Sequence, residues 1–397
     1  MTGNAVHDSL SQRVAGMTNI PLGKATQTIT PASVAGRRAL YTPVVDFLLL
    51  GGATIFILPV AALIPESYGP RILVFLFWLS FLINQPHFMH SYQIFYRDFY
   101  NKLSGTGYAR QLRMRYAFAG IVVPMIILVV FAVAYISGSS SLLAFCAYSV
   151  AFFVGWHYVK QGYGILIVDT VLNRSFFNEP EKKILRVNAY ACWIYFFLLM
   201  NNLMRERDYN GFRFNLFNVP LPVVYVATVV MMITTLLAAK SFYDATRRNR
   251  GRPFPINGTT AYVVSIYVWL SIYFTSTAAA FTVIPALHSL QYLAVVWRYE
   301  KNRNESLALA SGASAPADLA VKKFLRFTTA GIVLGVIVFV AVPFSLDAQI
   351  LYDKGVYGAR YFTFMFYVFI NIHHYFLDNV MWRKDNPDVS KHLFSVH

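Results

Sequence analysis

The stretch AFAGIVVPMIILVVFAVAYIS, residues 117–137, decides the fold class of this chain because it contains no charged residue. A helix needs about 20 apolar residues to cross the hydrocarbon core of a bilayer. Similar runs recur along nearly the whole length of 397 residues, of which 57% are hydrophobic and only 13% charged. A soluble domain carries about 25% charged residues. The sequence therefore predicts an all-α fold, a helical bundle embedded in a membrane.

Counting the apolar runs gives about ten predicted transmembrane helices. They cover residues 44–64, 71–92, 117–137, 141–162, 184–204, 219–240, 260–279, 280–297, 327–346 and 359–381. We expect residues 43–383 to form a single transmembrane helical domain. No polar loop separates the seventh predicted helix from the eighth.

The connections between these helices alternate between basic and near-neutral. The basic ones are the tail before the first helix, residues 97–116, 170–186, 240–259 and 298–326, and the C-terminal tail. Short basic connections stay in the cytoplasm, so we expect both termini to be cytoplasmic. The basic residues are spread over short connections between apolar runs, so we interpret the net charge of +16 as a signal of membrane topology. We expect no nucleic acid as a partner, because the basic residues do not form one patch. We expect an integral, multi-pass protein of a bacterial inner membrane, in contact with membrane lipids.

The two ends and one long connection carry little apolar sequence. Residues 1–42 are predicted to be a disordered cytoplasmic tail, and 384–397 a second cytoplasmic tail. The Ala, Ser and Gly of 304–320 predict a flexible loop. Asn188 and Asn201 are expected to hydrogen-bond between helices. The sequence indicates no oligomeric state, because lipid-facing and partner-facing apolar surfaces look alike.

Histidines are the unusual feature of the apolar runs. Nine are present, and six lie inside predicted helices: His87, His90, His157, His288, His373 and His374. All six fall on even-numbered helices, in the half nearest the cytoplasmic end. An imidazole in hydrocarbon needs a hydrogen-bond partner or a metal, and a single one is typically structural. Six in one layer predict a metal site with these histidines as ligands.

A polar side chain follows four of these histidines by about one helical turn, where it shares the same face. These residues are Gln93, Gln161, Gln291 and Asp378. Metal-bound imidazoles donate their second nitrogen to such oxygens, so the four are candidate supports of the metal ligands. Interhelical polar clamps would have the same spacing. Asp378 is open to three roles: ligand, base or partner of Arg383. Asp378, Tyr92 and Gln161 are the candidate catalytic residues.

Helical geometry predicts how the paired histidines point. His87 and His90 are three residues apart and should point the same way. His373 and His374 are adjacent and should diverge by about 100°. Nitrogen ligands suit iron, copper or zinc. The scarcity of carboxylates argues against a ferritin-like di-iron site, and the absence of HExxH argues against a zinc protease.

Isolated histidines spread over segments 84–97, 155–164, 286–298 and 371–383 give the chain a resemblance to bacterial Brp/Blh-type β-carotene dioxygenases. This resemblance is one of style and implies a non-haem iron centre that cuts or oxidises an isoprenoid. The expected function is then that of a membrane oxidoreductase or oxygenase acting on a lipid or isoprenoid. Membrane fatty-acid desaturases are a second comparison, but their HxxxH and HxxHH boxes lie outside the bilayer.

Two other functions remain open from the sequence. In a haem-binding electron-transfer protein, His157 and His288 would be a natural axial pair. In a proton- or metal-coupled transporter or channel, the histidines would act with Lys160, Asp169 and Asp378. An oxygenase should retain its metal through purification, whereas a transporter should bind it weakly.

Overall fold

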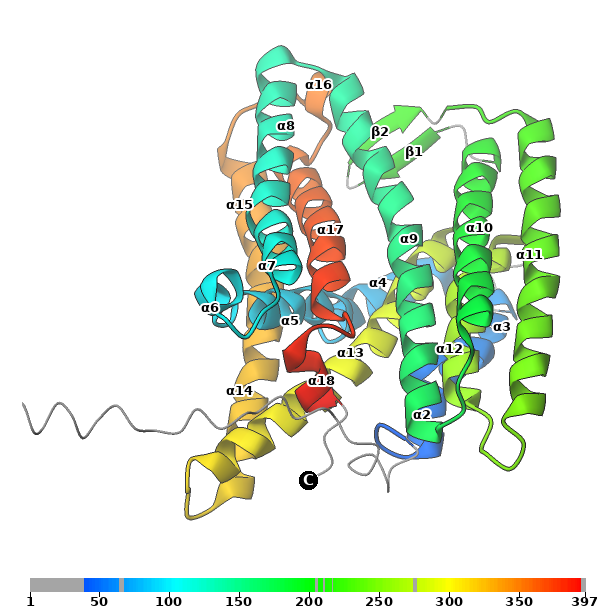
Figure 1. Ribbon diagram of the computed structural model, residues 1–397. Coiled ribbons are helices and arrows are strands. Elements are labelled where there is room, and N and C mark those ends of the chain that lie inside the picture. The colour runs from blue at the N-terminus through cyan, green and yellow to red at the C-terminus, as the bar shows by residue number, and fades with distance from the viewer. Residues whose placement is uncertain are drawn as a thin grey trace, which may run out of the picture.

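The computed structural model describes residues 39–63, 68–203, 206–209, 211–215, 217–273 and 277–393, and this part is almost entirely helical (Figure 1). The first half comprises α2 (Pro43–Phe47), η2 (Leu48–Gly52), α3 (Ala53–Leu63), α4 (Gly69–Ser80), α5 (Asn84–Tyr96), α6 (Phe99–Ser104), α7 (Arg110–Ala117), η4 (Phe118–Val122), α8 (Val123–Ser137), α9 (Ser140–Asn173) and α10 (Glu179–Leu203). The second comprises β1 (Glu206–Tyr209), β2 (Phe212–Asn215), α11 (Leu221–Arg248), α12 (Ile256–Tyr267), η5 (Val268–Tyr273), α13 (Thr277–Ala310), α14 (Pro316–Val336), η6 (Ile337–Ala341), α15 (Val342–Gln349), α16 (Lys354–Tyr357), α17 (Tyr361–Met381) and α18 (Pro387–Leu393). The predicted all-α class is confirmed.

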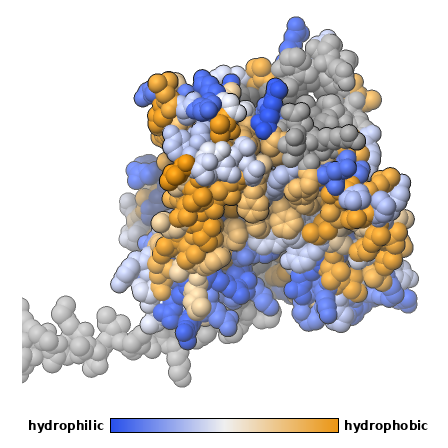
Figure 2. Space-filling view, turned by 90° about the horizontal axis from the view of Figure 1, so that it is seen from above, coloured by the Kyte–Doolittle hydropathy of each residue, from blue (hydrophilic) through white to orange (hydrophobic). Residues whose placement is uncertain are grey.

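Six helical segments of the described part are long and apolar enough to cross a membrane. They are Pro43–Val60, Arg110–Ser137, Ser140–Asn173, Glu179–Leu203, Leu221–Arg248 and Pro316–Gln349. Large apolar side chains point outward from them, as at Val226 and Leu236 of α11. Figure 2 shows broad apolar areas on the face seen from above. Such outward apolar surface is what hydrocarbon, not water, would cover, and it indicates a membrane protein.

Two of these segments contain a π-helical turn just before a proline. η4 precedes α8, whose second residue is Pro124, and η6 precedes α15, whose second residue is Pro343. Proline has no N–H to bond the carbonyl four residues earlier, so the helix widens locally instead of closing its normal ladder. The carbonyls of Ala119 and Gly120 in η4 bond His373 and Tyr96 instead.

Two predictions about helix boundaries are wrong. The helix expected over 71–92 is broken at 81–83 into α4 and α5, because Pro86 has no N–H for the carbonyl of Leu82 and its ring crowds that carbonyl. The flexible loop expected over 304–320 is mostly helix, since α13 continues to Ala310 and α14 begins at Pro316. Ala and Leu favour helix here, and the chain turns only at 311–315, where Gly312 has a φ of 65°.

A short antiparallel hairpin, β1–β2, was not predicted; it lies within the expected loop 205–218. Its register pairs Glu206 with Asn215 and Tyr209 with Phe212. Gly211 has a φ of 86°, and its N–H donates to Asp208 Oδ1 at 2.8 Å, which closes the turn. The ring of Phe212 contacts Phe364 of α17, so the hairpin covers the first turns of that helix.

The two ends of the described chain are packed against the bundle (Figure 1). Leu40 is buried, and its N–H donates to the carboxylate of Asp46. The last residues of the predicted tail 1–42 are therefore packed against the bundle, and residues 1–38 lie outside the described residues. At the other end, α18 lies under α13, where Asn302 donates to the carbonyl of His392. Much of the predicted C-terminal tail is thus a docked helix.

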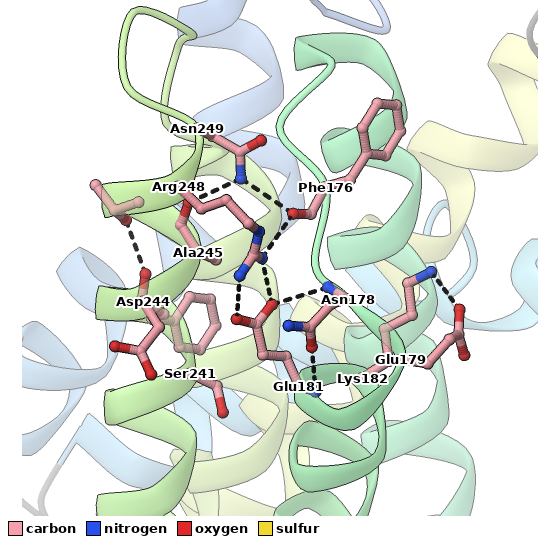
Figure 3. Close-up of polar contacts among 12 residues, drawn as sticks. Phe176, Asn178, Glu179, Glu181, Lys182, Ser241, Asp244, Ala245, Arg248 and Asn249 are labelled. Carbon is pink, nitrogen blue, oxygen red and sulfur yellow. Dashed lines mark hydrogen bonds and ion pairs between the residues drawn. The ribbon is translucent and has the colours of Figure 1, made fainter.

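A polar cluster joins the start of α10 to the end of α11; we call Asn178, Glu181 and Arg248 the α10–α11 cap (Figure 3). The N–H of Glu181 donates to Asn178 Oδ1 at 2.9 Å, and the N–H of Asn178 donates to Glu181 Oε2 at 2.8 Å. This reciprocal pair satisfies N–H groups at the start of the helix. Arg248 then holds both oxygens of Glu181, at 2.7 and 2.5 Å.

The two asparagines expected to link helices behave differently. Asn188 donates to Thr234 and Thr235 of α11 and accepts from Tyr262 of α12, so its predicted role is confirmed. Asn201 donates to the carbonyl of Phe197 in its own helix, and no bond from it to another helix is found among the described residues. Its prediction as an interhelical link is wrong, because its oxygen faces no donor among the described residues.

Candidate metal centre

Four buried side chains from three helices could hold a metal ion. They are His87 of α5, His157 of α9, and His374 and Asp378 of α17, and one ligand atom from each lies within 4.8 Å of all the others. His288 of α13 adjoins them, with its ring centroid 4.9 Å from that of His157. We call these five residues the histidine cluster. The structure thus brings four of the six predicted histidines together, with Asp378.

The histidine cluster contains buried polar atoms that have no hydrogen-bond partner among the described residues. They are Nε2 of His87, His157 and His374, both ring nitrogens of His288, Nδ1 of His374, and Asp378 Oδ2. Each such atom costs about 1–3 kcal/mol of desolvation. Two opposite ligands about 2.1 Å from an ion lie about 4.2 Å apart, close to the observed spread. A metal ion among these lone pairs would remove the penalty.

A hydrogen-bond chain fixes the protonation of His87. Ser289 Oγ donates to Asn84 Oδ1 at 2.8 Å, so its single hydrogen is committed there. The contact of 3.1 Å between His87 Nδ1 and Ser289 Oγ is then donated by the imidazole. The proton therefore lies on Nδ1, and Nε2 presents a free lone pair to the cluster. Such support is typical of metal-binding histidines, and the sequence did not reveal it.

Within the described part of the chain, only one oxygen of Asp378 accepts a hydrogen bond. Tyr292 donates its hydroxyl to Asp378 Oδ1 at 2.9 Å, and Trp382 Nε1 donates to the Tyr292 oxygen at 3.3 Å. The other oxygen, Oδ2, lies 3.4 Å from His374 Nε2 and 3.8 Å from His157 Nε2. Tyr292 was missed by the sequence prediction, although it stands one turn after His288, where a second polar group could have been sought.

His90 points away from the other histidines. Its ring stacks on Phe327 of α14, and its Nδ1 bonds Gln93 Oε1 at 2.8 Å. A Cβ at Gly331 would meet the His90 ring at 2.3 Å, so the glycine makes room for it. The expectation that His87 and His90 point the same way is wrong. Three residues along a helix differ by about 60°, which is enough here to face different neighbouring helices. The expected partner of His90, Gln93, is the one observed.

His373 also lies outside the cluster, on the side of α17 facing η4. Its Nδ1 is 2.8 Å from the Tyr92 hydroxyl, and its Nε2 is 3.0 Å from the carbonyl of Ala119. Tyr96 donates to the next carbonyl, Gly120, which Pro124 cannot bond. The predicted divergence of His373 and His374 is confirmed, and Tyr92 is directed at His373.

Gln161 and Gln291 form an interhelical clamp. Gln161 Nε2 donates to the backbone carbonyl of His288 at 3.1 Å and to Gln291 Oε1 at 3.3 Å. Gln291 Nε2 donates to the carbonyl of Leu50 in η2 at 2.7 Å. Of the two open readings, the clamp is the one observed, and these amides position α13 through its backbone and leave the His288 ring nitrogens without a partner.

The charged residues considered for transport have their own partners. Asp169 accepts from the N–H of Gly258 in α12 at 2.8 Å and from Asn173 at 2.9 Å. Lys160 donates to Asn379 Oδ1 and lies 4.7 Å from the centre of the Trp156 ring. These contacts tie α9 to its neighbours.

The carboxyl end of α5, the helix that carries His87, is closed by Lys102 of α6. Its Nζ donates to the carbonyls of Ile94 and Phe95, at 2.7 and 3.0 Å. Burial lowers the pKa of Lys102 to about 8, while the charge of Asp388 acts in the opposite direction. This ammonium is therefore held by carbonyl oxygens at some electrostatic cost.

Compared with known proteins, the chain matches no family model, no curated protein and no solved structure. The arguments about its function therefore rest on its own residues.

Proposed function

We propose that this protein is a membrane oxidoreductase or oxygenase whose buried histidine cluster binds a non-haem metal ion, iron before copper or zinc, and acts on a lipid or isoprenoid. The observation that carries the proposal is the convergence of four buried ligand atoms within 4.8 Å, from a donor set of three imidazoles and one carboxylate. Such donors suit iron, copper and zinc and disfavour calcium or magnesium. The resemblance to Brp/Blh-type dioxygenases leads to the same class of chemistry.

Each residue of the cluster has a distinct proposed role. His87, His157 and His374 would hold the ion, and Asp378 Oδ2 would complete the set or accept a proton beside it. His288, with both ring nitrogens free, is the remaining group that could bind or move a proton. A bound iron would supply oxygen activation. Aromatic rings exclude water, because Tyr375 stacks on His157 and Tyr158 on His288.

The direct ring contacts favour a bare ion over haem. His157 and His288, the pair expected for axial ligation, lie with ring centroids 4.9 Å apart in edge-to-face contact. His374 packs equally close to His157. A porphyrin would have to enter between rings that already touch, whereas a single ion fits among their free nitrogens.

We also propose about ten transmembrane helices with both termini cytoplasmic, in a bacterial inner membrane. In addition to the six apolar segments, α13 and α17 have 34 and 21 residues, which is enough to cross the hydrocarbon core. α2 and α18 lie at the same end of the bundle in Figure 1, and the turns 174–178, 249–255 and 311–315 lie there too. The basic residues around these turns support a cytoplasmic position for that end.

The test is elemental analysis with an absorption spectrum of the detergent-purified protein. The proposal expects near-stoichiometric iron, without a Soret band, that persists through gel filtration. A Soret band would establish haem instead. A folded, metal-free preparation that takes up metal only weakly and reversibly would contradict the proposal and favour transport.

A further inference from the structure

A second feature of the bundle is an apolar pocket of about 60 Å³ between α9, α10, α12 and η5. Its walls are almost entirely aliphatic and aromatic. They comprise Ala151, Val154, Gly155, Val159, Trp193, Phe196, Phe197, Met200, Asn201, Ile266 and Trp269. A Cβ at Gly155 would meet the Trp193 ring at 2.6 Å, so the absent side chain lets the indole lie against α9. A pocket of this size is too small to enclose a whole drug-sized ligand and has room only for one end of an elongated apolar molecule.

Asn201 is the polar member of the wall. The residue is only 4% exposed, and its Nδ2 donates to the carbonyl of Phe197 at 2.7 Å. Its Oδ1 is buried and has no donor among the described residues. A carbonyl oxygen left without a donor in apolar surroundings is unfavourable. The oxygen itself does not face the open space of the pocket, so a ligand can supply the missing donor only when the Asn201 amide turns toward the cavity.

A stack of aromatic rings connects this pocket to the histidine cluster. Trp269 of the pocket wall stacks on Tyr158, with ring centroids 6.1 Å apart. Tyr158 in turn stacks on His288 at 3.7 Å. Only two aromatic residues separate the pocket from the imidazole whose nitrogens are both free. The pocket thus adjoins the candidate metal centre.

We propose that this pocket binds the hydroxyl-bearing end of an apolar lipid or isoprenoid alcohol. On binding, the Asn201 amide turns toward the cavity and its Oδ1 accepts a hydrogen bond from the ligand hydroxyl. The first segment of the apolar chain fills the space between Trp193 and Ile266, and the rest lies outside the pocket. That this alcohol is also the substrate rests on the proposed function, whereas its binding does not.

Equilibrium binding to the purified protein tests the proposal, with Trp193 and Trp269 as fluorescent reporters in the wall. The probes are a long-chain isoprenoid alcohol and its methyl ether, which lacks the donor. The wild type should bind the alcohol about tenfold more tightly than the ether, as expected for one hydrogen bond to a buried acceptor. Asn201→Leu should abolish this preference. Asn202→Leu is the matched control, because Asn202 bonds the carbonyl of Val219 and does not line the pocket.

Equal binding of alcohol and ether by the wild type would overturn the proposal, and this comparison needs no variant. Persistence of the preference in a folded Asn201→Leu protein would overturn it as well. Ala151→Phe, which fills the pocket, should weaken both probes. Metal content measured on the same preparations separates the two proposals. A preference for the alcohol in metal-free protein would support the proposed pocket and contradict the metal centre. Bound metal without that preference would support the metal centre and contradict the proposed pocket.

Discussion

The α10–α11 cap and the histidine cluster are both polar clusters built around buried carboxylates, Glu181 and Asp378, but only in the cap are the hydrogen bonds of the carboxylate complete. In the cap, Glu181 receives two bonds from Arg248 and one from the N–H of Asn178, and it donates its own N–H to Asn178 (Figure 3). In the histidine cluster, Nε2 of His374 and Oδ2 of Asp378 face each other without a hydrogen bond, and neither atom has a hydrogen-bond partner elsewhere among the described residues.

The presence or absence of hydrogen-bond partners distinguishes polar groups that stabilise the fold from polar groups that are available to bind a ligand. A helix end needs acceptors for its N–H groups, and the cap provides them within the protein. Imidazole lone pairs that converge without donors add nothing to the stability of the fold alone. They become favourable when an ion binds. The two clusters should therefore respond oppositely to substitution: stability should change at the cap and metal content at the histidine cluster.

The largest expected effect is loss of the metal on His374→Ala. This imidazole is 0% exposed and sits against both His87 and His157, so its removal leaves an incomplete ligand set. Metal content should fall from near-stoichiometric to below about a tenth, measured by elemental analysis of folded protein. His90→Ala is the control. Its ring faces Phe327, so the metal should be retained.

Equal metal loss in both variants would mean that the sequence-based prediction, which counted His90 as a ligand, describes the site better than the geometry does. Full retention in His374→Ala would remove the histidine cluster as the metal centre.

A smaller effect is expected from Ser289→Ala, which leaves every candidate ligand in place. Without Ser289 Oγ, His87 Nδ1–H loses its acceptor, and the ring is free to rotate or to change tautomer. Metal affinity should fall about 10- to 100-fold, measured by competition with a chelator. Ser306→Ala, also on α13, is the matched control and should leave the affinity unchanged. Unaltered affinity in Ser289→Ala would show that His87 is not a ligand.

The sequence predicted the parts of the fold that depend on composition. Runs such as 117–137 and 219–240 predicted helices because their length and apolarity suffice without tertiary contacts. The break at 81–83 depends on Pro86, which a count of apolar residues ignores, and the helix over 304–310 was hidden because the Ala, Ser and Gly of 304–320 indicate a loop by composition. The hairpin β1–β2 was missed because a short polar segment with one glycine carries little signal of pairing.

The candidate site was predicted in part. The position of each histidine along its predicted helix correctly placed His87, His157, His288 and His374 in one layer of the bundle. It did not separate them from His90 and His373, because a difference of 60° to 100° around a helix decides which neighbour each faces. Partners from other helices, such as Ser289 for His87, could not be found by counting along one helix.

At the cap, Glu181→Ala should lower stability rather than metal content. The substitution removes an acceptor of the Asn178 N–H and the carboxylate that holds Arg248, whose side chain is 43% exposed, so water screens part of the ion pair. We expect a loss of about 2 kcal/mol, seen as a fall of a few degrees in the unfolding temperature. Glu179→Ala, which removes an exposed carboxylate, should leave that temperature unchanged. Metal loss in Glu181→Ala would break the distinction between the clusters.

Lys102 is intermediate between these two clusters: its buried ammonium donates to two carbonyls, but within the described residues no carboxylate lies close enough to form an ion pair with it. Its pKa of about 8 in the folded protein lies below the ordinary value of 10.5. Between these values the unfolded chain holds more protons than the folded one, so stability rises with pH. From pH 7.5 to 9 the wild type should gain about 1 kcal/mol from this group, and Lys102→Met should lose that gain. The measurement is the unfolding temperature against pH for both proteins, with Lys391→Met as the control. Parallel pH profiles for Lys102→Met and the wild type would show that burial does not lower the pKa of Lys102.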